Sequence, residues 1–191
     1  MKHAVGVALV TMFAVLANTP ANSCELAEIL RARAVIAESD ATYVEQRHVH
    51  YVTKPILAAG RLRYRSPDRL EMIVEEPKPE SFIYQDGVLS IAGDTAVSGN
   101  DISVESYILL STLFSALVGT LSGDEAKLRS KFDLFFTDSD CAWQLTLVPK
   151  AERARGKVDG IDLTGTKDRI EQIVLKLSNG DRSVLTIREN E

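Results

Sequence analysis

The spacing of apolar residues changes along the chain, from a helical period near the start to a period of two further on. Residues 25–38 carry Leu26, Ile29, Leu30 and Ile36 at helical spacing without Gly or Pro, which predicts an amphipathic helix. From Thr42 onward apolar and polar residues alternate, as is typical of antiparallel strands with one buried and one wet face. The clearest alternating apolar positions are Leu62, Tyr64, Leu70, Met72 and Val74.

Residues 104–121 break this alternation with a long apolar run that has no charge after Glu105. Apolar residues surround much of the helical circumference, so we expect a deeply covered helix. A short polar helix over residues 123–130 should follow it. These two helices interrupt the strand pattern in the middle of the chain.

Strand signals return in the last third, and Asn179-Gly180-Asp181 predicts a hairpin turn between the final two strands. The pattern predicts roughly ten short strands and two or three helices, an α+β fold with a curved antiparallel sheet. Its concave apolar face would be available for a helix to cover. The expected late strands span residues 132–137, 142–148, 158–165, 170–177 and 183–188.

The first 23 residues resemble an export signal that is removed from the mature chain. Lys2 precedes 14 mostly apolar residues, 4–17, and small residues at 21–23 offer a cleavage site. This run is shorter than the roughly 20 apolar residues of a membrane span. We therefore expect residues 24–191 to form one exported domain.

The charge balance and the cysteine content of the chain limit which partners and which covalent links we expect. Residues 24–191 carry 21 basic and 27 acidic side chains, a balance that disfavours nucleic acid as a partner. The basic runs at 61–65 and 153–157 are then interpreted as solvated faces. Cys24 and Cys141 could form a disulfide in an oxidising compartment, or Cys24 could be lipidated, although the leucine expected three places before a lipidated cysteine is absent.

Candidate chemistry is sparse. His48 and His50 stand two apart on one predicted strand, but zinc needs three or four ligands, so we expect no metal. No nucleophile elbow, phosphate-binding glycine loop or metalloprotease helix is present. The pairs Asp138/Asp140 and Asp159/Asp162 lie in turn-like stretches. We therefore expect neither catalytic residues nor cofactors, with a hydrolase that uses the two histidines as a minor alternative.

Residues 60–70, GRLRYRSPDRL, are similar to the "G-x-L-x-(aromatic)-x-x-P-x-x-(apolar)" segment of the LolA family of periplasmic lipoprotein carriers. In the same order as in that family, residues 43–47 resemble one of its strands, 77–89 resemble its hairpin with Asp-Gly, and 147–150 resemble one of its strand ends. The arginine that this family places before the proline to latch its lid is Ser66 here, with Arg65 one position earlier. Residues 67–70 and 180–185 look closer to LolA-related proteins encoded beside fatty-acid or polyketide-type synthesis genes.

The resemblance implies an unclosed β-barrel whose helices cover an apolar cavity for acyl chains. It implies a monomeric carrier that takes a lipoprotein or acyl lipid from an inner-membrane exporter to an outer-membrane acceptor. The alternative is an envelope binding module that senses lipid or lipoprotein without transport; it would be expected to carry a second domain or a long extension after Glu191. Arg65 is the candidate for the polar head of the cargo, and the candidate lining residues are Tyr43, Leu62, Tyr64, Leu70, Met72, Val74, Phe82, Leu113, Phe114 and Leu117.

Overall fold

The computed structural model describes residues 24–92 and 103–190, which form one ten-stranded antiparallel sheet and four helices. The expected export signal therefore lies outside the described residues. In chain order the elements are α1 (Leu26–Ala34), β1 (Glu38–His48), β2 (Ile56–Arg65), β3 (Arg69–Glu76), β4 (Glu80–Gln85), β5 (Val88–Ala92), α2 (Val104–Leu121), α3 (Glu125–Lys131), β6 (Phe132–Ser139), β7 (Ala142–Pro149), α4 (Glu152–Arg155), β8 (Val158–Thr166), β9 (Arg169–Leu177) and β10 (Arg182–Glu189).

The sheet consists of two meanders joined at their first and last strands. Its order is β5-β4-β3-β2-β1-β10-β9-β8-β7-β6, so β1 pairs with β10 and the edge strands are β5 and β6. The two edges do not pair with each other among the described residues, and the barrel stays open. The predicted α+β class with a curved, unclosed antiparallel sheet is confirmed.

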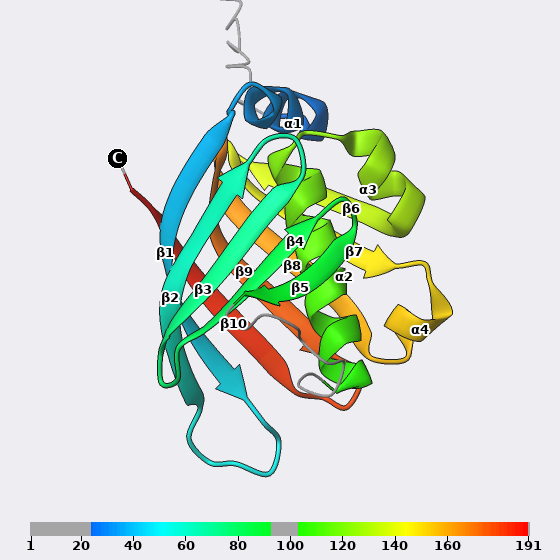
Figure 1. Cartoon of the computed structure of the whole chain (residues 1–191). Helices are drawn as coiled ribbons and strands as arrows, with labels where there is room; N and C mark the ends of the chain where they lie inside the picture. Colours follow the sequence, from blue (N-terminus) through cyan, green and yellow to red (C-terminus); the bar gives the residue numbers. More distant parts are fainter. Residues whose placement is uncertain (1–23, 93–102, 191) are drawn as a thin grey trace, which may run out of the picture.

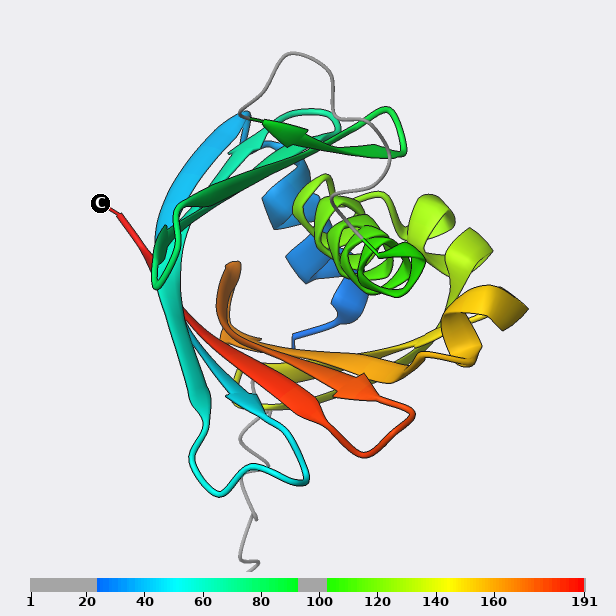
Figure 2. The same cartoon turned by 60° about the horizontal axis from the view of Figure 1, so that its bottom comes forward.

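The chain passes from one edge strand to the other through α2 and α3, because β5 precedes α2 and β6 follows α3. Figure 2 shows α2 lying between the two arms of the curved sheet, on its concave side. In Figure 1, α1 lies across one end of the half-barrel, beyond the ends of the strands. The connection between the two meanders thus supplies the cover of the concave face.

Two expectations about the helices were wrong in part. The first helix ends at Ala34, because residues 37 and 38 join the sheet: the Ala37 carbonyl accepts from Ser66 N at 2.8 Å and Glu38 pairs with Arg65. Only the second half of α2, from Thr112, is buried, while Val104 and Tyr107 remain exposed. The single turn of α4 is too short to leave a periodic signal.

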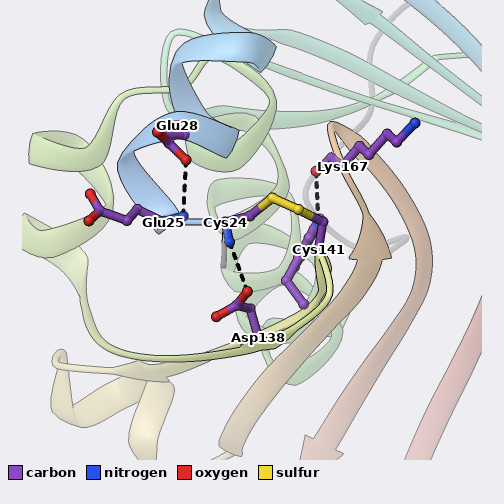
Figure 3. The surroundings of a disulfide bond; sticks show 7 residues. Cys24, Glu25, Glu28, Asp138, Cys141 and Lys167 are labelled. Carbon is purple, nitrogen blue, oxygen red and sulfur yellow. Dashed lines mark hydrogen bonds between the residues drawn. A yellow bond between two sulfur atoms is a disulfide. The ribbon is translucent and has the colours of Figure 1, made fainter. Parts of the chain in front are cut away.

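The disulfide in the structure joins Cys24 to Cys141, whose Cα atoms lie 5.1 Å apart (Figure 3). Cys141 occupies the two-residue turn between β6 and β7, where it and Asp140 have positive φ angles of 61° and 52°. Beside it, Asp138 accepts a hydrogen bond from Cys24 N at 2.8 Å. The start of α1 is therefore attached to the far meander, 117 residues away in sequence.

Backbones approach closely where the register of β2 and β3 shifts, between Ala59 and Gly60. A Cβ atom at Gly60 would overlap the backbone carbonyl oxygen of Ile73 and lie 3.1 Å from the Tyr43 ring. The Ile73 carbonyl is backbone and cannot turn aside as a flexible side chain would. Glycine is therefore required here by the approach of the neighbouring strand.

We expect Gly60→Ala to lower the free energy of unfolding by about 1–3 kcal/mol, the usual cost of overpacking a tight contact. The matched control is Gly156→Ala, because the nearest atom to a Cβ there is the Glu152 carbonyl oxygen at 3.6 Å and its φ of −68° suits alanine. Urea denaturation of both variants measures the difference. Equal stabilities would contradict the close approach at Gly60.

Candidate lipid-binding site

The concave face of the sheet is built from alternate strand positions, and these positions are apolar over most of its area. On β2 and β3 the inward residues are Leu62, Tyr64, Leu70 and Met72, each buried. The opposite meander contributes a matching set from β7 to β10. Since the side-chain period of a strand is two, one face of each strand supplies the apolar surface and the other stays wet. The inward residues of the second meander include Leu145, Leu147, Ile161, Leu163, Ile170, Ile173, Leu175, Leu185 and Ile187.

A small cavity of about 30 Å³ lies between this face and α2. Its apolar lining comes from β1, β2, β3, β9 and β10 on the sheet side and from Leu117 and Leu121 on the helix side. A volume near 30 Å³ is about the share of one water molecule, whereas ligand pockets span roughly 300–1,000 Å³. Side chains of the sheet and of α2 therefore occupy most of the apolar space between them in this structure.

The predicted lining residues divide into three groups. Leu62, Tyr64, Leu70 and Leu117 contact the cavity itself. Another five are buried in the core that surrounds it, while Val74 is partly buried and packs against that core. The five core residues are Tyr43, Met72, Phe82, Leu113 and Phe114.

Arg65 lies on the other side of the sheet, away from the cavity. Its neighbour Tyr64 points inward, and consecutive strand residues point to opposite faces. The Arg65 guanidinium pairs with Glu38 at 3.3 Å and with Asp40 at 3.4 Å. This placement makes Arg65 part of an outer row of ion pairs with Arg61 and Arg63, separate from the cavity.

Sequence reasoning missed the half of the lining that comes from the second meander and the end of α2. Ile170, Ile173, Ile187 and Leu121 contact the cavity. Their alternation was visible as strand signal, but nothing local shows that β10 pairs with β1 and so brings Ile187 beside Tyr43. Two polar residues, Ser39 and Glu189, also line the cavity and were not predicted.

Tyr43 carries a polar group into this apolar region. Its side chain is 2% exposed, and its hydroxyl has no hydrogen-bond partner among the side chains and backbone that the structure describes. Burial, and secondarily the charges of Glu45 and Glu75, raise the pKa of Tyr43 above its usual value. The folded protein therefore holds this phenol neutral where an unfolded chain would ionise it.

We expect Tyr43→Phe to raise stability by about 1 kcal/mol at neutral pH, because it removes a buried unpaired hydroxyl. The same variant should lose less stability in alkali. Because the pKa of Tyr43 is higher in the folded than in the unfolded protein, ionisation of the unfolded chain above about pH 10 lowers the stability of the parent further, and phenylalanine removes this loss. Unfolding curves at pH 7 and pH 10.5 test this, with the exposed Tyr51→Phe as control. Destabilisation by Tyr43→Phe would contradict the unpaired hydroxyl.

Polar contacts gather at the end of the half-barrel where β1 ends and β10 begins. Ser183 donates a hydrogen bond to the buried Glu45 carboxylate, which also pairs with Arg47 at 3.1 Å. His50 lies beyond the end of β1, so it does not share a strand face with His48 as expected. Its backbone N and its Nδ1 both contact Asp181, and the backbone and side-chain hydrogen bonds from His50 lower the pKa of that carboxyl.

Of the carboxylate pairs Asp138/Asp140 and Asp159/Asp162, one member of each has a partner elsewhere in the fold. Asp138 accepts from Cys24 N, and Asp140 occupies the β6–β7 turn. Asp162 accepts from Thr146 and pairs with Lys176 at 2.6 Å. Within residues 24–92 and 103–190, no three His, Cys, Asp or Glu side chains come together as a possible metal site.

A family model described as "Outer membrane lipoprotein carrier protein LolA-like" matches residues 18–187. A search of curated proteins finds no significant match. Solved structures with a similar fold include MucB (14% identity, TM-score 0.47, covering 86% of this chain and 57% of that one) and the Pseudomonas aeruginosa MucA/MucB complex (15%, 0.44, 86% and 56%).

The LolA superfamily protein NE2245 from Nitrosomonas europaea is 9% identical, with a TM-score of 0.46 and coverage of 87% of this chain and 92% of that one. This chain spans little more than half of the MucB chains, whereas it spans most of NE2245. The family match over nearly the whole chain confirms the resemblance seen in residues 60–70. The protein belongs to the family of LolA-like outer membrane lipoprotein carrier proteins.

Proposed function

We propose that this protein is a periplasmic carrier, which shelters the acyl chains of a lipoprotein or acyl lipid between its sheet and α2. The observation that carries the proposal is an apolar concave face covered by a helix in the connection between the two edge strands, β5 and β6. A cover that pairs with neither edge can move without breaking strand hydrogen bonds. Membership of the LolA-like family supports the same function.

Burial of hydrocarbon supplies enough energy for reversible loading. Each CH2 removed from water contributes about 0.8 kcal/mol, so ten carbons contribute several kcal/mol. Because the cavity has a volume of only about 30 Å³, part of the free energy of burial must drive the movement of α2 away from the sheet. At its exposed end α2 is joined to the connection between α4 and β8 by the solvent-accessible Lys157–Glu105 ion pair, a contact of small energy.

The cellular role that we propose follows the family. Residues 1–23 would direct export, and the domain would receive its cargo from an inner-membrane exporter and deliver it to an outer-membrane acceptor. The cargo would be a lipoprotein or, following the likeness to proteins encoded beside lipid-synthesis genes, an acyl or polyene lipid. Carriage requires no chemical change of the cargo.

Native mass spectrometry of the protein after mild extraction tests this function. We expect a complex with one acyl-bearing molecule, and stoichiometric uptake of a fluorescent fatty acid by the emptied protein. Loaded protein should then transfer that lipid between two vesicle populations faster than spontaneous exchange. Bare polypeptide with no uptake would overturn the proposal, binding without transfer would favour a sensing module, and release of a cleaved product would favour a hydrolase.

A further inference from the structure

Arg33 is the most deeply buried charged residue of α1, with a side chain only 1% exposed. Its Nη1 donates to the carbonyl oxygen of Asp168 at 3.0 Å and to Glu189 Oε1 at 3.0 Å. Its Nε and Nη2 are buried as well, and neither has an acceptor among the residues that the structure describes. One side of the guanidinium is therefore occupied while the other carries unpaired N–H donors.

Such donors are costly to leave unpaired. A guanidinium has five N–H groups and stays charged at any physiological pH, so it cannot relieve the burial by losing its proton. A buried donor without an acceptor destabilises the fold, and more so when the group is charged. A ligand that brings an oxygen acceptor to Nε and Nη2 would recover this energy on binding.

Arg33 is linked to the cavity through Glu189, which accepts from its Nη1. Glu189, the carboxylate that holds Nη1, lines the cavity together with Ser39 and Tyr64. Burial raises the pKa of the Tyr64 hydroxyl, and the charge of Arg33 acts in the opposite direction, as expected for a neighbouring cation. The rest of the lining is aliphatic. The arrangement is that of an amphiphile site, with one polar end and one hydrocarbon end.

We propose that Arg33 binds the neutral carbonyl oxygen of an ester or amide at the base of an acyl chain whose tail lies against Leu62, Leu70 and Leu117; this rests on the proposed carrier function. The charge balance selects a neutral acceptor. Glu189 already neutralises Arg33, so a free carboxylate would bring a second negative charge into a buried site. An ester or amide carbonyl satisfies the N–H groups without adding charge.

Competition for the protein against the fluorescent polyene fatty acid cis-parinaric acid tests this assignment. The competitors are a methyl ester, an N-methyl amide, a methyl ether and a free acid of one chain length. We expect ester and amide to bind about tenfold tighter than the ether, the gain from one or two hydrogen bonds. Arg33→Lys keeps the charge but loses the planar fork, so the preference should fall to about twofold.

The control is Arg31→Lys on the same helix, since Arg31 is exposed and its Nε donates to the Ala27 carbonyl oxygen. This variant should keep the tenfold preference. The infrared band of a 13C-labelled ester carbonyl gives a second readout on the unaltered protein, which does not depend on the folding of a variant. We expect the band to shift to lower frequency than in hydrocarbon solvent.

Equal affinities for ester and ether, or a carbonyl band at its hydrocarbon position, would overturn the assignment of Arg33 while the carrier function stands. Tighter binding of the free acid than of the ester would overturn the charge argument and favour an anionic head. Failure of every competitor and of the probe itself would overturn the carrier function as well.

Discussion

Replacement of both Cys24 and Cys141 by serine is expected to lower the free energy of unfolding by about 4–5 kcal/mol. In the chain-entropy model, a disulfide stabilises a protein by restricting its unfolded chain, and the restriction grows with the closed loop. This loop has a sequence separation of 117 residues and includes α1, strands β1 to β5, the helices α2 and α3, and β6. For a domain of this size, the change corresponds to a fall in Tm of about 10–15 °C.

Calorimetry of the double variant, beside the parent protein with and without a thiol reductant, measures this effect. Reductant should lower the Tm of the parent toward that of the variant and leave the variant unchanged. Asp138→Asn is the matched control, because it weakens the hydrogen bond from Cys24 N without opening the loop, and its effect should stay near 1 kcal/mol. Equal Tm values for parent and double variant would contradict a stabilising role for the disulfide.

Much of the fold was accessible from local pattern because each strand carries its own evidence. Alternation at Leu62, Tyr64, Leu70 and Met72 fixes which face is buried, and turn residues such as Asn179-Gly180 mark where hairpins reverse. In a meander consecutive strands pair, so local evidence also gives most of the topology. The exception is the β1–β10 pair, which joins residues about 140 positions apart and leaves no local signal.

The candidate site was only partly predictable for the same reason. Residues of the first meander could be assigned to the lining from their alternation and their family resemblance, whereas Ile170, Ile173 and Ile187 required the tertiary pairing. Arg33 gave no signal at all, because an arginine on an amphipathic helix is normally solvated. Its burial depends on Glu189 and the Asp168 carbonyl, both distant in sequence.

Because the cavity is small, an acyl chain can enter only if α2 moves away from the sheet, and the effect of substitutions on binding can test this movement. If α2 must move before cargo enters, the apparent affinity equals the intrinsic affinity reduced by the fraction of molecules in the open state. Any change that weakens only the closed packing should then improve binding, even though it destabilises the fold. Leu117 is suited to this test because it is buried on α2 and faces the cavity.

We expect Leu117→Ala to lower the free energy of unfolding by about 2–5 kcal/mol, as large-to-small core substitutions do. The same change should tighten binding of a fluorescent fatty acid at least about tenfold. The closed state loses all the contacts of the leucine, whereas in the loaded state a flexible acyl chain can fill the space, as ligands fill an apolar cavity made by substitution. Titration of the probe into both proteins, with urea denaturation alongside, measures the two effects.

Leu145→Ala provides the control, since Leu145 is fully buried on β7 and does not line the cavity. It should lower stability by a similar amount without a gain in affinity, because the space that it opens is not part of the cavity lining. A gain in both variants would assign the effect to general loosening of the core. A loss of affinity in Leu117→Ala would show instead that the acyl chain depends on contacts that the closed structure already offers, and that α2 does not need to move for loading.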